Sequence, residues 1–185
     1  MTHEILFAGF GGQGVLSMGM TLSYAGMLEG KEVSWMPSYG PEMRGGTANC
    51  IVIISNKIIS SPIVTTFDAV IVLNQPSLDK FEKAVKPNGI LLYDSTNIII
   101  PPSRTDITVL PVAAEYEAQL LGNLKVRNMI MLGAFLSICE VVHTSSIVKA
   151  LGQVLPARYH HLLTVNQQAL ERGEALVIEA ATPLV

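Results

Sequence analysis

Charged side chains are scarce in this sequence. Of its 185 residues, 15% are Asp, Glu, Lys or Arg, whereas a soluble domain usually carries roughly 25%. A small domain has a large surface for its volume and normally covers that surface with charge. The shortage favours a chain that buries part of its surface against other chains, because permanent interfaces resemble a domain core cut in half. A monomer with a polar but uncharged surface is the alternative.

Other absences disfavour whole classes of function. The net charge is −3 and no cluster of basic residues occurs, which argues against nucleic acid as a partner. No apolar run is long enough to cross a bilayer and no signal stretch opens the chain, so we expect a cytoplasmic protein without a membrane partner. The two cysteines, Cys50 and Cys139, lack the spacing of an iron–sulfur or zinc site, and the four histidines lack metal-ligand spacing. We therefore expect no metal on this chain.

The first forty residues have the pattern of a strand, a glycine loop, a helix and a second strand. Residues 4–10 form a short apolar run, and apolar residues then recur at helical spacing from Val15 to Leu28. Gly30 stands where a helix ends, and residues 31–39 are typical of a strand. This order is typical of the opening of a doubly wound sheet.

The next strand breaks that scheme. About ten residues rich in Gly and Pro separate the second strand from the apolar residues 47–55, and a parallel crossover needs about a dozen or more. The third strand is therefore predicted to be antiparallel, and the sheet to be mixed. Residues 56–62 are predicted to continue it as a hairpin.

Strands and helices alternate up to residue 112, and only helices follow. The pattern predicts a strand at 67–74, a helix that begins near Pro76 and stops at 87–89, and strands at 90–95 and 107–112. Beyond them it predicts helices at 113–121 and 126–142 and two more up to about residue 172. Residues 175–185 are predicted to be a frayed tail or a docking segment. We expect one domain over residues 1–185, a three-layer Rossmann-like α/β fold with a mixed, mostly parallel sheet and helices on both faces.

The glycines at the end of the first strand raise the possibility of a dinucleotide site. Gly9, Gly11 and Gly14 have the spacing G-x-G-x-x-G. NAD binding also needs an Asp or Glu about twenty residues later, at the end of the second strand, but that strand ends in "WMPSY". NAD is therefore disfavoured. Two interpretations remain: an anion-binding site at a helix N-terminus, or glycines that permit close packing.

A second glycine-rich loop, "PSYGPEMRGG" at residues 37–46, follows the second strand. Arg44 lies beside two glycines, so it can reach a phosphate or carboxylate; alternatively it pairs with Glu42 and stiffens the loop. In an open α/β sheet, ligands bind outside the carboxyl ends of the strands. Besides these two, the residues predicted there as candidate binding residues are Gly11, Gly12, Gln13, Ser38, Tyr39, Gly40 and Asn74. They suit binding of a polar or anionic molecule, and no catalytic acid–base pair or nucleophile accompanies them.

Four segments together carry a resemblance to a known family: "GFGGQGVLSMGMTLSYAG", "PSYGPEMRGGTANCIVIIS", "FDAVIVLNQPSLDKF" and "VRNMIMLGA". From about residue 4 to residue 165 the chain resembles the gamma subunit of the 2-oxoacid:ferredoxin oxidoreductases. The combination of G-x-G-G-Q-G with S-Y-G-P-E-x-R-G-G is far more specific than either motif alone.

The resemblance implies a subunit of an enzyme complex. Such complexes decarboxylate a 2-oxoacid on thiamine diphosphate, pass electrons through iron–sulfur clusters to ferredoxin, and transfer the acyl group to coenzyme A. The alpha and beta chains hold thiamine diphosphate, the beta or delta chains hold the clusters, and the gamma chain packs near the coenzyme A cleft. By position, Gly11, Gly12 and Gln13 would form the glycine turn, and the loop facing the active-site subunits would contain Ser38, Tyr39, Gly40, Glu42 and Arg44.

The isolated chain is expected to bind no cofactor and to be inactive, because it lacks cluster ligands and a thiamine-binding acidic motif, and its low charge predicts self-association when its partners are missing. The substrate is expected to be a 2-oxoacid such as 2-oxoglutarate, a branched-chain oxoacid or pyruvate. Two other functions stay open: a stand-alone protein that binds a nucleotide or coenzyme A, and a purely structural subunit.

Overall fold

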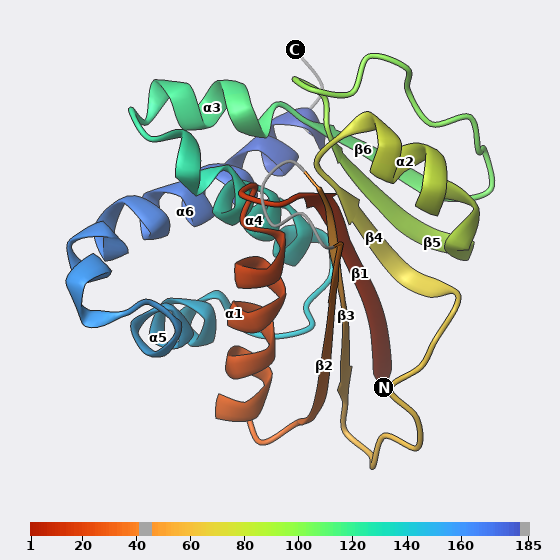
Figure 1. Cartoon of the computed structure of the whole chain (residues 1–185), viewed down its shortest axis with the longest axis horizontal. Helices are drawn as coiled ribbons and strands as arrows, with labels where there is room; N and C mark the ends of the chain where they lie inside the picture. Colours follow the sequence, from red (N-terminus) through yellow and green to blue (C-terminus); the bar gives the residue numbers. More distant parts are fainter. Residues whose placement is uncertain (41–45, 182–185) are drawn as a thin grey trace.

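A six-stranded sheet with helices on both faces forms the framework of the protein (Figure 1). The computed structural model describes residues 1–40 and 46–181. The strand order is β2-β3-β1-β4-β5-β6, and the strands are β1 (Thr2–Phe10), β2 (Glu32–Tyr39), β3 (Thr47–Ser55), β4 (Phe67–Val72), β5 (Val85–Asp94) and β6 (Thr108–Val112). β3 is antiparallel to both of its neighbours, whereas β1, β4, β5 and β6 pair in parallel. The predicted mixed, mostly parallel α/β sheet is confirmed.

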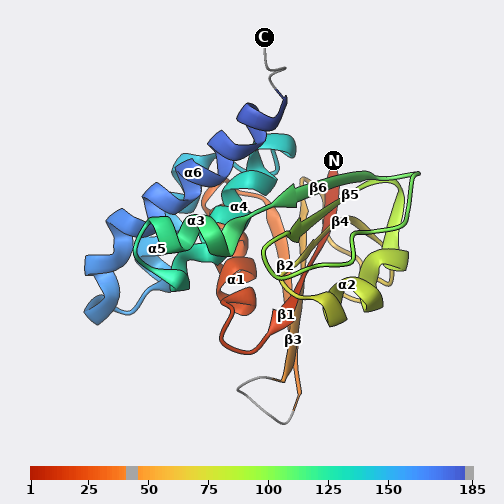
Figure 2. The same cartoon turned by 90° about the horizontal axis from the view of Figure 1, so that it is seen from above.

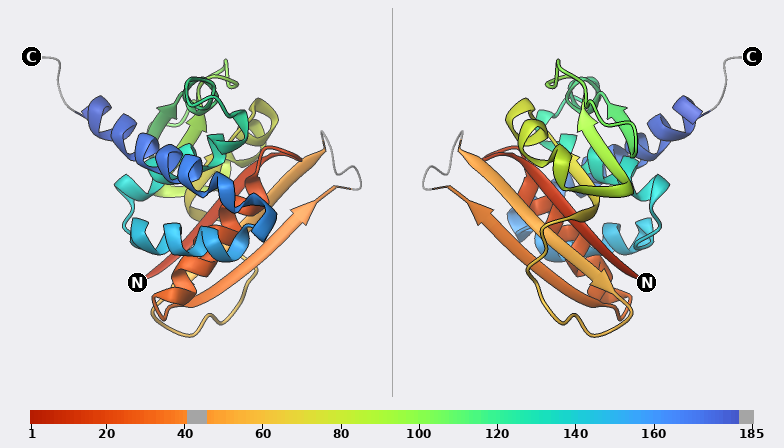
Figure 3. Two further views of the ribbon diagram at one scale, coloured as in Figure 1. Left: turned by 90° about the vertical axis from the view of Figure 1, so that its left-hand side faces the viewer. Right: turned by 90° about the vertical axis from the view of Figure 1, so that its right-hand side faces the viewer.

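The antiparallel strand arises from the short connection after β2. Tyr39 pairs with Ala48, and Gly40 N–H donates to Thr47 O at 3.1 Å, so β3 turns back directly along β2. The opposite edge of β3 pairs with β1, in a register that joins Phe10 to Thr47. β2 lies at the outer edge of the sheet, and both views of Figure 3 show β2 and β3 extending away from the other strands.

The helices divide unequally between the two faces. They are α1 (Val15–Leu28), α2 (Gln75–Phe81), α3 (Ala114–Leu120), α4 (Arg127–Ile138), α5 (Thr144–Val154) and α6 (Leu163–Ala181), with short 3₁₀ segments at Glu82–Ala84, Leu124–Val126 and Ala157–Leu162. Figure 2 shows α2 on one side of the sheet and the five other helices on the opposite side. Because α4 lies between the sheet and α6, it is buried on almost every side.

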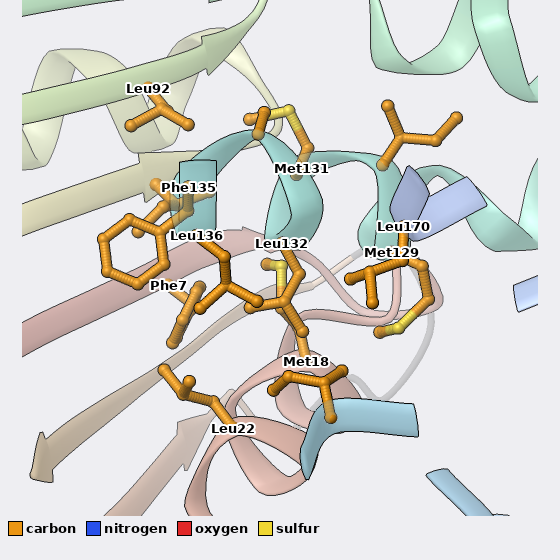
Figure 4. Packing of buried hydrophobic residues seen from close by; sticks show 14 of the residues in the cluster. Phe7, Met18, Leu22, Leu92, Met129, Met131, Leu132, Phe135, Leu136 and Leu170 are labelled. Atoms are coloured by element: carbon orange, nitrogen blue, oxygen red, sulfur yellow. The ribbon is translucent and has the colours of Figure 1, made fainter. Parts of the chain in front are cut away.

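The larger hydrophobic core lies between the sheet and α4 (Figure 4). Phe7 of β1 meets Phe135 of α4 edge to face, with ring centroids 6.5 Å apart, a favoured aromatic geometry. Met18 and Leu22 of α1 and Leu170 of α6 also belong to this core; in the view of Figure 4 the two α1 residues lie below α4 and Leu170 lies to the right. The helix predicted at 126–142 is therefore buried as expected, although α4 ends at Ile138.

Some sequence predictions about local structure are wrong. Residues 56–62 form an irregular connection to β4 and not a hairpin strand. The reason is that both edges of β3 are already paired, one with β2 and one with β1. The predicted helix end at 87–89 is also wrong, because α2 ends at Phe81 and β5 begins at Val85.

The segment at 87–89 is an irregularity within β5. Asn88 has a φ of 62°, and the pairing of β5 with β4 shifts register between Phe67 and Ala69. A Pro-Asn-Gly sequence is locally typical of a helix stop, but Val85 before it is buried and pairs with Phe67. Tertiary pairing therefore decides this segment. In the same way α6 runs to Ala181, beyond the predicted end near 172, because Leu176 and Val177 pack on the core.

Candidate functional site

The carboxyl ends of β1, β2, β4 and β5 lie along one edge of the sheet, since these strands share one direction. The glycine turn at 11–14 follows β1, Ser38 to Gly40 end β2, and Asn74 follows β4. These sequence-predicted residues therefore lie along one edge. Glu42 and Arg44 lie outside the described residues, so their ion pair and their ligand contacts stay predictions.

A cavity of about 470 Å³ opens beside the glycine turn. Among the predicted binding residues, Gly11, Gly12 and Tyr39 line it. The other lining residues are mostly apolar: Phe10, Gly14, Val15, Leu16, Ser17 and Ala48. The Tyr39 side chain is 63% exposed at the mouth of this cavity, so it is available to a ligand or to another chain.

The backbone of the turn takes a conformation that requires glycine at two positions. Gly12 has a φ of 95° and Gly14 a φ of 79°, in the left-handed region that L side chains rarely adopt. Gly14 is the N-cap of α1, no side chain caps it, and the first turn of α1 holds no acidic residue. The positive end of the α1 dipole therefore borders the cavity, and no acidic side chain in the first turn of α1 offsets it, which suits an anion.

Gln13 and Asn74 face the protein. The Gln13 Oε1 atom accepts hydrogen bonds from Phe10 N–H at 2.6 Å and from Asn74 Nδ2 at 3.2 Å. Its Nε2 atom donates to Leu73 O at 3.3 Å. Asn74 is buried, and its Oδ1 atom accepts from Ser77 N–H at 2.9 Å, which caps α2. Neither residue lines the cavity.

Asn128 belongs to this site, although the sequence interpretation missed it. It lies at the start of α4, is buried, and donates from Nδ2 to Gly14 O at 3.2 Å. A polar side chain in a largely apolar helix is the only local signal for such a role. The contact joins residues 114 positions apart, so its partner is set by tertiary packing.

A separate polar cluster lies beyond the cavity, at the end of β5. Asp94 is buried and accepts hydrogen bonds from Thr96 N–H at 3.1 Å and from Asn97 Nδ2 at 3.2 Å. Burial raises the pKa of Asp94 above its ordinary value, and these hydrogen bonds partly oppose that shift. Asn97 also donates to Glu115, which pairs with Arg127. The cluster ties β5 to α3 and α4, and its members do not line the cavity.

The described part of the chain holds no group of three His, Cys, Asp or Glu side chains that could bind a metal ion. Cys50 and Cys139 are both free thiols, and burial raises the pKa of the Cys50 thiol to about 12. β2 ends in Ser38 and Tyr39, so no carboxylate stands where NAD would need one. Nor does any helix in residues 1–40 and 46–181 have the length and apolar character needed to cross a bilayer.

Comparison with known proteins identifies the family of this chain. The sequence profile described as "Pyruvate ferredoxin/flavodoxin oxidoreductase" matches residues 4–176. Ketoisovalerate oxidoreductase subunit VorA of Methanothermobacter thermautotrophicus is 46% identical over 135 residues, which are 73% of this chain and only 28% of VorA. 2-Oxoglutarate synthase subunit KorC of Methanocaldococcus jannaschii is 32% identical over 160 residues, or 84% of this chain and 85% of KorC.

A solved structure agrees with the fold. The keto/oxoacid ferredoxin oxidoreductase gamma subunit of Geobacter sulfurreducens PCA superposes with a TM-score of 0.81 at 28% identity, over 96% of this chain and 99% of that one. The match extends over nearly all of both chains, and the sequence profile covers the glycine turn and the cavity. The chain therefore belongs to the pyruvate ferredoxin/flavodoxin oxidoreductase family and corresponds to its gamma subunit, as the sequence motifs predicted.

Proposed function

We propose that this chain is the gamma subunit of a multi-subunit 2-oxoacid:ferredoxin oxidoreductase, which converts a 2-oxoacid to an acyl-coenzyme A and delivers electrons to ferredoxin. The observation that carries the proposal is the cavity beside the glycine turn, in a chain of this family. The relatives described above are a subunit of a ketoisovalerate oxidoreductase and a subunit of a 2-oxoglutarate synthase, so the substrate class we propose is the 2-oxoacids.

The partial match to VorA supports the proposal that several chains together carry out the reaction. The segment of VorA that matches this chain makes up 28% of that subunit, so in VorA it is one part of a longer polypeptide. In the protein described here we propose that separate alpha and beta chains, with or without a delta chain, supply the rest. Thiamine diphosphate and the iron–sulfur clusters would lie on those chains, since the described residues of this one offer no cluster of metal ligands. The complex would work in the cytoplasm, where both thiols stay reduced.

The residues around the cavity fit one part of coenzyme A. A phosphate group suits the glycine turn, where the α1 N-terminus is not opposed by an acidic side chain in its first turn. The apolar walls and Tyr39 suit the rest of an extended ligand. The space beside Gly12 is open to a ligand, because a β-carbon placed there would have no atom within 4 Å. Ser38 and Gly40 would complete the rim, and Glu42 and Arg44 are proposed to contribute from the following loop.

The test compares two exposed tyrosines in the complex reconstituted with its partner chains. Tyr39→Ala removes an aromatic side chain from the cavity mouth, whereas Tyr116→Ala removes one of similar exposure, 53%, from α3. We expect Tyr39→Ala to raise the KM for coenzyme A about tenfold, which corresponds to about 1.4 kcal/mol. The KM for the oxoacid should not change, and Tyr116→Ala should leave both constants unchanged.

The alternatives give different results. If Tyr39→Ala impairs assembly but the assembled complex keeps its KM for coenzyme A, the chain is a purely structural subunit. If the isolated wild-type chain binds coenzyme A or an adenine nucleotide tightly by calorimetry and does not associate with alpha and beta chains, it is a stand-alone binding protein.

A further inference from the structure

The glycine turn is held from two sides by side-chain amides. On the β4 side, Gln13 binds the backbone N–H of Phe10, just before the turn, and the carbonyl of Leu73, just after β4. Asn74 donates to the same Gln13 oxygen, so the β4 end and the turn share one hydrogen-bonded unit. On the α4 side, Asn128 donates to the carbonyl of Gly14.

These amides account for two of the glycines. A β-carbon on Gly9 would lie 2.6 Å from Gln13 Oε1, and a β-carbon on Gly14 would lie 2.6 Å from Asn128 Nδ2. Both distances are below the van der Waals contact limit, so a side chain at either position would displace an amide. Gly12 differs, because its surroundings are open and it lines the cavity. The glycine spacing therefore serves two purposes: room for the amides and access for a ligand.

The hydrogen-bond partners of Gln13 limit what it can do. Its oxygen already accepts two hydrogen bonds and its nitrogen donates one to a backbone carbonyl, while its side chain does not line the cavity. A ligand contact through the oxygen would require these bonds to break, and the second N–H of the amide belongs to a side chain that does not line the cavity. In their present arrangement they fix the backbone between Phe10 and Gly14, whose own bonds are Gly11 N–H to Gly46 O at 2.8 Å and Gln13 N–H to Phe10 O at 3.1 Å.

We propose that Gln13, held in place by Asn74, is a positioning residue that presets the glycine turn for its ligand and does not itself touch that ligand. This inference rests on the proposed function, because the ligand is taken to be coenzyme A. Presetting matters energetically, since a turn that must be ordered at the moment of binding loses affinity.

Two neutral variants test the role. Gln13→Ala removes all three side-chain hydrogen bonds. Asn74→Ser removes only the donor to Gln13, because serine is itself a good N-cap and can still accept from Ser77 N–H. The matched control is Asn123→Ser, the same substitution at the cap of the 3₁₀ segment Leu124–Val126, where Asn123 accepts from Lys125 N–H at 3.1 Å.

Two readouts are measured. In the isolated chain, hydrogen exchange of the backbone amides at positions 11 and 13 should accelerate in both variants and not in the control. In the reconstituted complex, each variant should raise the KM for coenzyme A by about three- to tenfold, the effect of losing about one hydrogen bond. The kcat and the KM for the oxoacid should stay within twofold. The double variant should have no larger effect than Gln13→Ala alone, since both residues act through one unit.

Each contrary result has a distinct meaning. A raised KM in Gln13→Ala with no effect of Asn74→Ser and unchanged exchange would make Gln13 a direct ligand contact. Faster exchange and a lower melting temperature without any change in KM would reduce the unit to a purely structural role. Both results overturn the inference while the proposed function stands. If the active wild-type complex shows no dependence on coenzyme A, the proposed function fails and the inference fails with it.

Discussion

At the scale of single residues, Arg172 of α6 binds two carboxylates that differ in exposure. It donates to both oxygens of Glu117 on α3, at 2.8 and 3.1 Å, and to Glu179 on its own helix at 2.8 Å. The Glu117 side chain is 11% exposed, whereas that of Glu179 is 60% exposed. Both carboxylates favour the charged guanidinium and raise the pKa of Arg172. The two partners differ mainly in the water that surrounds them.

We expect Arg172→Ala to lower the free energy of unfolding by about 2 kcal/mol or more, because it leaves the buried Glu117 carboxylate without its partner. Glu179→Ala removes only the exposed pair and should change stability by less than about 1 kcal/mol. Urea unfolding of the two variants at neutral pH measures both values. Because Arg172→Ala removes both pairs, equal losses in the two variants would show that the buried pair contributes nothing to stability.

At the scale of elements, the crossing of α4 and α6 depends on two glycines. A β-carbon on Gly133 of α4 would lie 2.0 Å from Leu170 O, and one on Gly173 of α6 would lie 2.0 Å from Ile130 O. The two helix backbones therefore touch directly. The contact helps to hold α4 against the core. Because Asn128 lies at the start of α4, the crossing also helps to place one of the amides that bind the glycine turn.

Gly133→Ala should lower the free energy of unfolding by about 1–3 kcal/mol, the usual cost of overpacking, since backbone atoms cannot move aside as a flexible side chain can. Gly152→Ala is the control, because Gly152 lies within α5 and a β-carbon there meets no atom within 4 Å. It should raise stability by up to about 1 kcal/mol through helix propensity. Thermal unfolding measures both changes, and the prediction fails if the melting temperature shifts in the same direction in both variants.

At the scale of the whole molecule, the chain has few charged residues and exposes several apolar side chains. Ile58 and Ile99 are 86% and 91% exposed, and charged residues make up only 15% of the chain. Such a surface is typical of a chain that is covered by others.

We expect the isolated chain to self-associate at high concentration, to have no oxidoreductase activity, and to show no iron–sulfur absorbance. Addition of the alpha and beta chains should replace self-association by a complex of defined mass. Light scattering during gel filtration, with and without the partner chains, measures this. A monomer that stays monodisperse at high concentration would contradict the prediction.

Local signals were sufficient for much of the fold. Glycines, prolines and apolar runs predicted the opening strand, α1 with Gly30 just beyond its end, and the antiparallel third strand, because each depends on neighbouring residues or on the length of one connection. The same signals failed at residues 56–62 and at 87–89. There the pairing of β3 and β5 with distant strands outweighed the local preference.

Some features of the candidate site could likewise be predicted from the sequence, and others could not. The sequence by itself determined that glycines end β1, that no carboxylate ends β2, and that the chain is of the gamma-subunit type, since these are properties of residue type and order. Only the tertiary structure decided which way the amides face. Gln13 meets Asn74 from 61 positions away and Asn128 meets Gly14 from 114, and no local pattern encodes such pairs. Strand order and the packing of α4 bring them together, which directs Gln13 toward the protein and leaves Gly12 open to the cavity.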